Sequence, residues 1–269
     1  MQSSYRQFFA LQSEPFASDV AQKDILVTPA VSAVQDRVHY AVRLGAVALV
    51  TGEIGSGKST ALRYCIGGLH PSEYRVLSVT ASSGSILELY RQILAELGQE
   101  DAGVSRARMT RCIRREVLEW VKGKKIKTLL VIDEASLLRL EVFAELHTLS
   151  QFEHDSKPYL PIVLAGQANL LDSLRYRTGL PLASRVIAKS HLKGIDQKTM
   201  EDYLRHHLAL AGVDRMLFDD AAVTAIHQGS GGLFRKANHL ARGALVAAAH
   251  QKTPLVTAEH VRVAATEIF

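Results

Sequence analysis

Gly52-Glu53-Ile54-Gly55-Ser56-Gly57-Lys58-Ser59 is the stretch that decides the fold of this chain. It matches the pattern G-x-x-x-x-G-K-S/T at every fixed position. An apolar segment of strand length, residues 46–50, comes just before it, and residues 60–64 have the composition of a helix start. A strand, a glycine loop and a helix in this order predict a P-loop, where backbone N–H groups and the helix dipole surround a phosphate. The flanks disfavour the alternative, a glycine-rich turn that matches the pattern by chance.

The P-loop assigns a role to each of its polar residues. Lys58 is expected to reach the β- and γ-phosphates of a nucleoside triphosphate, and the Ser59 hydroxyl is expected to ligate Mg²⁺. The residues from Gly52 through Ser59, together with Thr60 in the first helical turn, are therefore expected to bind ATP.

An acid pair follows a second apolar run. Residues 129–132 are wholly apolar, and Asp133 and Glu134 come directly after them. This is typical of a buried parallel strand whose carboxyl end enters an active site. Asp133 is placed to hold the Mg²⁺, usually through water, and Glu134 to orient and deprotonate an attacking water. The alternative is that these acids only cap the next helix.

A polar side chain ends a third apolar segment. The strand-like residues 161–166 lead to Gln167, with Asn169 behind it. The carboxyl ends of parallel strands meet at one edge of a sheet, so Gln167 is expected beside the γ-phosphate. Either side chain could instead cap the turn.

The order of elements predicts an α/β fold. Apolar runs of strand length alternate with helical patterns up to about residue 194, which indicates an αβα parallel sheet with the P-loop at the carboxyl end of its first core strand. From residue 195 on, only helical patterns occur, so we expect a nucleotide-binding domain in residues 1–194 and a small helical lid in residues 195–269. Asp196 and Thr257 are expected to cap lid helices, and Ser85 to cap a helix of the first domain. The expected strands are residues 46–50, 76–80, 128–132, 161–167 and 186–192, and the expected helices are residues 30–44, 85–97, 104–121, 138–152, 196–210, 219–227, 233–250 and 257–269.

The first 30 residues are aromatic and contain prolines. Phe8, Phe9, Leu11 and Phe16 make this lead-in too apolar for a disordered tail. We expect it to pack against the nucleotide-binding domain, near the adenine.

The charge of the chain is compatible with a nucleic-acid partner without being diagnostic of one. The formal net charge is +5, and 47% of the residues are hydrophobic. The expected helix 104–121 is rich in arginine, and a lysine group at residues 122–127 follows it. The alternatives are a surface for DNA phosphates and an ordinary solvated helix face. The loop at residues 82–85, with Ser83, is a second candidate DNA contact. The arginines concerned are Arg106, Arg108, Arg111, Arg114 and Arg115.

Several protein classes are disfavoured by what the chain contains. Two cysteines, Cys65 and Cys112, are too few for a disulfide framework or a zinc site, and we expect small buried or half-buried thiols. The first residues lack the charged region and the following apolar region that a signal peptide contains. No apolar run approaches the roughly 18 residues of a membrane span. We therefore expect a cytoplasmic protein without direct membrane insertion.

Five segments together resemble the ExeA-type ATPase domain of the AAA+ class, over nearly the whole chain. Its Walker motifs are common to many families, whereas the lead-in and the glycine-glycine-x-x-arginine segment are more specific. The segments are Tyr5-x-x-Phe8-Phe9-x-Leu11-x-x-x-Pro15-Phe16, Gly52 to Lys58, Asp133-Glu134-Ala135, Gly166-Gln167 and Gly231-Gly232-x-x-Arg235.

The resemblance implies further roles. Gln167 would be the first sensor of the γ-phosphate, and Arg235 the second sensor, which reports the nucleotide to the lid. Arg185 would be an arginine finger inserted into the neighbouring subunit's site, with Arg177 as the next choice. The alternative for each arginine is an ordinary surface position. The chain departs from the family at Ser136, where a glutamine is common, and larger members continue into a membrane segment, which puts an envelope role in doubt.

Two functions remain open at this point. The first is an ATPase that forms a homo-oligomeric ring or filament on double-stranded DNA, similar to the target-selecting ATPases of transposable elements, with a transposase as a possible partner. The second is a secretion ATPase that acts on protein partners at the inner membrane through a separate membrane subunit. Hydrolysis is expected to be slow until subunits assemble. A small-molecule kinase is disfavoured, because such kinases usually lack an acid pair on a strand followed by a four-helix lid.

Overall fold

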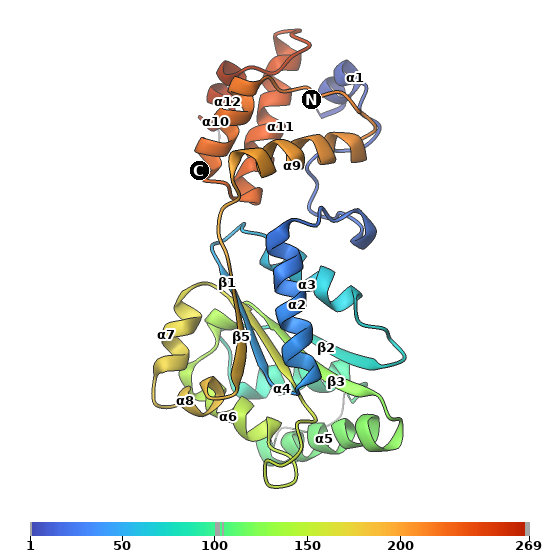
Figure 1. The fold of residues 1–269 in the computed structure, drawn as a ribbon, viewed down its shortest axis with the longest axis vertical. Helices are drawn as coiled ribbons and strands as arrows, with labels where there is room; N and C mark the ends of the chain where they lie inside the picture. Colours follow the sequence, from blue (N-terminus) through green and yellow to red (C-terminus); the bar gives the residue numbers. More distant parts are fainter. Residues whose placement is uncertain (1, 100–102, 104, 267–269) are drawn as a thin grey trace. The chain divides into compact units, whose positions relative to one another are not determined.

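The computed structural model describes residues 2–99, 103 and 105–266, which form two compact units (Figure 1). The sheet unit comprises Pro29–Gly52 and Lys58–Leu192. The helical unit comprises Met1–Thr28, Glu53–Gly57 and Lys193–Phe269. The predicted boundary at residues 194 and 195 lies beside the change of unit after Leu192, but the lead-in belongs with the helices.

The sheet unit has five parallel strands in the order β2-β3-β4-β1-β5. This arrangement confirms the predicted α/β fold with a parallel sheet. Because β1, β3 and β4 are neighbours in the sheet, the P-loop and the acid pair follow strands at the same edge. The strands are β1 (Val47–Gly52), β2 (Tyr74–Thr80), β3 (Lys127–Asp133), β4 (Ile162–Gly166) and β5 (Val186–Leu192).

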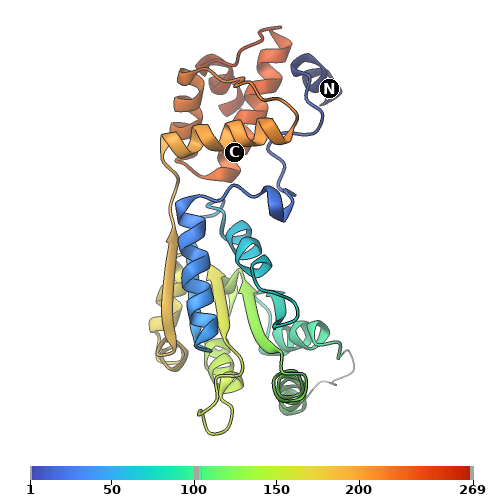
Figure 2. The same cartoon turned by 45° about the vertical axis from the view of Figure 1, so that its right-hand side comes forward.

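Helices cover both faces of the sheet (Figure 2). Alternate side chains of the strands pack against the helices on each face. Successive residues of a strand point to opposite faces, so Val131 packs with one layer of helices and Ile132 with the other. One layer contains α2 (Pro29–Arg43) and α3 (Lys58–Gly67). The other layer contains α4 (Ile86–Glu96), α5 (Arg106–Leu118), α6 (Leu140–Ser150), α7 (Asn169–Arg175) and α8 (Leu180–Ala183).

Some local predictions in the sheet unit need correction. Ser85 occupies the N-cap position of α4, but its side chain makes no capping hydrogen bond. The expected helix 104–121 begins at Arg106 and continues from α5 into the π-helical turn η2 (Glu119–Gly123), while Val104 lies outside the described residues. The short helices α7 and α8 and the 3₁₀ turn η3 (Ala135–Leu137) were not predicted, nor was the 3₁₀ turn η1 (Gln22–Asp24) of the helical unit, because all of them are too short to show a period.

Four helices near the carboxyl end form most of the helical unit, as predicted. Asp196 caps the first of them, because its Oδ1 accepts a hydrogen bond from the Thr199 N–H at 2.8 Å. Thr257 caps the last one, and its own N–H donates to His260 Nδ1 at 3.0 Å. The last three residues of the predicted helix 257–269 lie outside the described residues. The helices are α9 (Gln197–Leu210), α10 (Asp220–Ser230), α11 (Phe234–His250) and α12 (Ala258–Ala265).

The lead-in packs in the core of the helical unit, so the expectation that it packs against the nucleotide-binding domain is wrong. It begins with α1 (Gln2–Phe9), and Tyr5, Phe9 and Phe16 are buried among the side chains of α9, α10 and α11. The Gln12 N–H donates to the carbonyl of Ala211 at 2.8 Å. The lid helices supply an apolar surface and free carbonyls at their ends, which satisfy both the aromatic side chains and the backbone of the lead-in.

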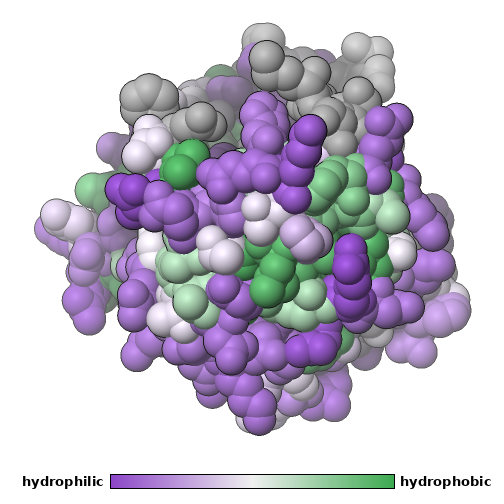
Figure 3. Space-filling model, turned by 90° about the horizontal axis from the view of Figure 1, so that it is seen from above, coloured by the Kyte–Doolittle hydropathy of each residue, from purple (hydrophilic) through white to green (hydrophobic). Residues whose placement is uncertain are grey.

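The surface carries both polar and apolar areas. Figure 3 shows one face, on which apolar residues gather in a central area surrounded by hydrophilic side chains. Among the helices of the described residues, none has the length and apolar character that a membrane crossing requires.

Candidate nucleotide site

The P-loop backbone has the conformation that its glycines were predicted to provide. Gly55 and Gly57 have φ angles of +84° and +93°, in the region that side chains rarely allow. The loop is closed by a hydrogen bond from the Ser56 N–H to the Glu53 carbonyl at 3.2 Å. The Ser56 side chain is 2% exposed, and its Oγ has no partner among the described residues. A buried, unpartnered hydroxyl of this kind indicates a place built for a further polar group.

Lys58 begins α3 and turns back toward the strand before the loop. Its Nζ donates to the Gly52 carbonyl at 3.0 Å, and the residue is only 6% exposed. Ser59 and Thr60 follow in the exposed first turn of the helix, where backbone N–H groups have no helical acceptor. The predicted lysine, hydroxyl and helix N-terminus are thus present in one short segment.

Ser59 and Asp133 are brought into direct contact. The Ser59 Oγ donates to Asp133 Oδ2 at 2.7 Å, although the two residues are far apart in the sequence. The contact arises because β1 and β3 both end at the same edge of the sheet, on either side of β4. The two residues predicted to hold a metal therefore lie side by side.

Glu134 has an unusual backbone conformation. Its φ is 53° and its ψ is 31°, the left-handed region, which typically costs a non-glycine residue about 1–3 kcal/mol. Its N–H donates to Asp133 Oδ1 at 2.8 Å, and its carbonyl accepts from the Leu137 N–H at 2.9 Å. These bonds hold the half-buried acid at the point where β3 turns into η3, in a conformation of the kind found at functional sites.

Ser136 joins the end of β3 to the end of β4. Its Oγ accepts a hydrogen bond from the Gln167 N–H at 3.2 Å. The approach is close, since a Cβ on Gly166 would lie 2.8 Å from the Ser136 backbone nitrogen. In the sequence alone, Ser136 differs from the family pattern and has no further mark of a role. Its position two residues after the acid pair was the one signal that it belongs to this edge of the sheet.

Arg235 approaches the P-loop within the helical unit. Gly231 and Gly232, with φ angles of +60° and +74°, end the turn before α11. The Arg235 N–H then donates to the Gly55 carbonyl at 3.4 Å, and Arg235 itself is exposed. A Cβ on Gly55 would lie 2.8 Å from the Arg235 Cβ. The backbone of the predicted second sensor is therefore adjacent to the loop.

Arg185 is held by groups of its own chain. Its Nε donates to His147 Nδ1 at 3.1 Å, its guanidinium forms an ion pair with Asp155, and its side chain is 20% exposed. Burial, followed by the charge of Arg185, lowers the pKa of His147. Arg185 precedes β5, which runs parallel to β1, so within the sheet it lies at the edge opposite the P-loop. Arg177 is exposed.

The five arginines of α5 do not share one face. Arg106 pairs with Glu145 at 2.8 Å. Arg114 donates to the carbonyls of Thr148 and Gln151. Arg108, Arg111 and Arg115 are exposed. In the loop at residues 82–85, the Ser83 carbonyl accepts from Arg139 Nε at 3.2 Å.

Comparison with known proteins identifies the central part of the sheet unit. Residues 42–174 match the family model described as an AAA domain. General secretion pathway protein A of Aeromonas hydrophila is 29% identical over 268 residues, which is 98% of this chain and 48% of that protein. ATP-dependent target DNA activator B of Escherichia phage Mu is 31% identical over 131 residues, 46% of this chain and 37% of that protein. The chain thus spans about half or less of the length of these relatives.

Solved structures share the fold of the whole chain. CDC6P from Pyrobaculum aerophilum has a TM-score of 0.67 at 15% identity, and the match covers 98% of this chain and 71% of that one. The ORC2 protein of Aeropyrum pernix has a TM-score of 0.70 at 16% identity, and the match covers 94% and 70% of the two chains. Residues 42–174 therefore form an AAA domain, and the chain is related in sequence to both the secretion protein and the phage DNA activators.

Proposed function

We propose that this chain binds ATP with Mg²⁺ and hydrolyses it. The hydrogen bond between Ser59 and Asp133 carries the proposal, because it places the hydroxyl and carboxylate that a P-loop metal requires next to each other. Lys58 contacts the β- and γ-phosphates, and Glu134 orients and deprotonates the attacking water. Gln167 senses whether the γ-phosphate is present. When bound, Mg²⁺ neutralises charge that develops on the phosphate oxygens.

The residues of the loop fit a phosphate chain. The glycine conformations leave room for backbone N–H groups to point at oxygens, and the buried Ser56 hydroxyl lacks a partner within the described residues. Positive charge comes from Lys58 and from the N-terminal end of α3. These features support ATP binding by the residues from Gly52 through Thr60.

We propose that hydrolysis depends on assembly of a homo-oligomer, as a ring or a filament, and is slow before it. Arg185 supplies the arginine finger to a neighbouring subunit, and Arg235 transmits the nucleotide state to the lid. The position of the Arg235 backbone beside Gly55 supports the second role.

The assembly acts on double-stranded DNA. Three observations support this proposal. One relative is a phage protein named as an ATP-dependent activator of target DNA. The ORC1 protein of Aeropyrum pernix, which shares the fold, has been solved in complex with DNA. The chain has a net charge of +5. We propose a role in transposition, with a transposase as partner, and the first observation supports it.

A second candidate function is supported by a different observation. General secretion pathway protein A matches 98% of this chain, far more than the phage activator does. The chain would then act on protein partners of a secretion system at the inner membrane.

Binding of the purified chain to duplex DNA separates the two functions. Binding is measured with ATP, ADP and no nucleotide, at low and moderate salt, beside Lys58→Ala. Large assemblies on DNA that require ATP and are absent in the variant support the DNA function. No DNA binding in any nucleotide state contradicts that function and leaves ATP hydrolysis to be tested separately.

A further inference from the structure

Three arginines form a stripe on the outward side of α5. Arg108, Arg111 and Arg115 are spaced three and four residues apart, so they fall on one side of a helix with 3.6 residues per turn. The opposite side contains Met109 and Ile113, which are buried in the core of the sheet unit. We call Arg108, Arg111 and Arg115 the outer stripe.

The other two arginines of α5 serve the fold. Arg106 lies on the inward side and pairs with Glu145 of α6 at 2.8 Å. The Arg114 guanidinium lies over the ring of Phe152 at 4.8 Å and donates to carbonyls at the end of α6. Arg106 and Arg114 therefore have partners on or beside another helix, although the Arg106 side chain remains 60% exposed.

The outer stripe has little compensating negative charge. Among the described residues, no ion pair joins Arg108 or Arg111 to an acid, and the acid that pairs with Arg115 is its neighbour Glu116, at 2.9 Å. Exposed pairs of this kind contribute little and exchange readily. The outer stripe therefore presents exposed guanidinium groups to the solvent.

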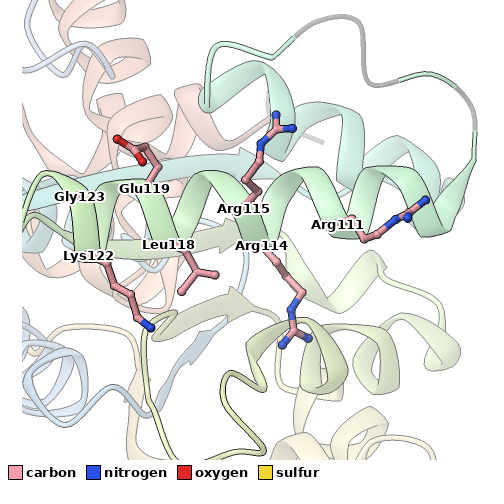
Figure 4. Close-up of a pocket in the computed structure, with 7 residues that line it drawn as sticks. All are labelled: Arg111, Arg114, Arg115, Leu118, Glu119, Lys122 and Gly123. Carbon is pink, nitrogen blue, oxygen red and sulfur yellow. The ribbon is translucent and has the colours of Figure 1, made fainter.

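A shallow hollow lies between the outer stripe and a second row on the same helix. Figure 4 shows Arg115 and Glu119 extending on one side of the helix, Arg114, Leu118 and Lys122 on the other, and Arg111 extending along the helix. Glu119 is the one acid among the residues that line the hollow. Lys122 pairs with Glu153, and Arg114 donates to backbone carbonyls, so the open positive charge of the hollow comes from Arg111 and Arg115. A concave surface with this charge is complementary to a polyanion.

We propose that the outer stripe of α5 is the contact for the phosphates of double-stranded DNA, an inference that rests on the proposed DNA function. The stripe spans about 10 Å along the helix axis, and duplex DNA carries one charge per ~1.7 Å, so the stripe covers several phosphates. Arginine binds phosphate through parallel N–H groups. No side chain of the stripe selects a base, so binding is independent of sequence.

The test compares two triple variants with the same change of charge. The stripe variant carries Arg108→Gln, Arg111→Gln and Arg115→Gln. The control variant carries Arg205→Gln, Arg215→Gln and Arg262→Gln, three exposed arginines of the helical unit. The dissociation constant for two unrelated duplexes is measured with ATP over a range of salt concentrations, for both variants and the wild type.

The stripe variant is expected to bind both duplexes about tenfold more weakly or worse. The magnitude of its slope of log K against log salt should fall by about 2 to 3, because each phosphate contact contributes about 0.9 to that slope. The control variant keeps the wild-type slope. Equal slopes in the stripe variant and the wild type would overturn the inference while the DNA function stands. Absence of wild-type binding would remove the DNA function itself. Unchanged ATP hydrolysis without DNA shows that the stripe variant is folded.

Discussion

The Ser136 Oγ accepts a hydrogen bond from the Gln167 N–H, with 3.2 Å between the two atoms. The bond completes a series of contacts along one edge of the sheet. Ser59 bonds Asp133, and Asp133 bonds the N–H of Glu134, which lies two residues before Ser136. The residues proposed to hold the metal, activate the water and sense the γ-phosphate are thus linked by hydrogen bonds and the backbone, and we predict that a change at Gln167 affects Glu134.

Replacing Ser136 by alanine tests this connection. Ser136→Ala leaves the Gln167 N–H without its partner, at a cost of about 1–3 kcal/mol where the group is buried. We expect the kcat for ATP to fall roughly tenfold while the Kd for ATP is unchanged, because no P-loop group is altered. Ser136→Thr keeps the hydroxyl and is expected to retain most of the activity. Equal loss of kcat and nucleotide affinity in Ser136→Ala would show a general structural role instead.

Gly57→Ala tests the conformation of the P-loop. Gly57 has a φ of +93°, and a Cβ there would lie 3.2 Å from the Phe234 ring. Gly98→Ala is the matched control, because Gly98 has a φ of +77° and open space around it. We expect comparable backbone strain of about 1 kcal/mol in both variants, but loss of binding of a fluorescent ATP analogue only in Gly57→Ala. Weakened binding in both would contradict a local role of the loop.

Asp155→Asn tests whether Asp155 restrains Arg185, the proposed arginine finger. Glu153, His154 and Asp155 all have left-handed backbone conformations, which asparagine tolerates well. The substitution weakens the ion pair with Arg185, which is worth about 1 kcal/mol or less. We expect ATP hydrolysis to reach half of its maximum at a roughly twofold to fivefold lower protein concentration. Arg185→Ala should abolish the dependence on concentration, and identical curves for Asp155→Asn and wild type would contradict the prediction.

His207 makes the stability of the helical unit depend on pH. It is buried, stacks on the ring of Phe16 and packs against the tilted ring of Tyr203. Burial, followed by the nearby His206, lowers its pKa from 6.5 to about 4. Above pH 6.5 the imidazole is neutral in both states. Below pH 6.5 the unfolded chain binds a proton at His207 that the folded chain excludes. The free energy of unfolding therefore decreases as the pH is lowered from 6.5 to about 4.

The expected loss is about 1.4 kcal/mol per pH unit at most within that window. Urea unfolding of the chain between pH 7 and 4.5 measures it, with the signal taken from the helical unit. His207→Phe keeps a stacked ring without a titrating group, and its unfolding free energy should fall less steeply. Parallel curves for the variant and the wild type would exclude His207 as the cause.

Much of the sheet unit could be predicted from the sequence, because its strands are apolar runs and its functional residues follow them directly. Ser59 and Asp133 were both expected at the metal, and the structure places them in contact because the parallel strands β1 and β3 end at one edge of the sheet. The position of the lead-in could not be predicted in this way. Phe9 and Phe16 show that the segment is buried, but burial alone does not say against which surface.

The arginines of α5 show a second limit of sequence reasoning. In the sequence the five arginines of α5 look alike. In the structure Arg106 pairs with an acid and Arg114 donates to backbone carbonyls, and these contacts distinguish them from the other three. Those partners belong to α6, which is remote in sequence. Ser136 was missed as a positioning residue for the same reason, because its partner is the N–H of Gln167 on another strand.

The most direct test of the account is steady-state ATP hydrolysis by the purified chain, measured with Mg²⁺ over a range of protein concentrations beside Glu134→Gln. We predict phosphate release that requires Mg²⁺, rises more than linearly with protein concentration, and falls by about 10² to 10⁴ in the variant, which has lost its general base. The variant should still bind ATP. Hydrolysis at the wild-type rate in Glu134→Gln would contradict the assignment of this site.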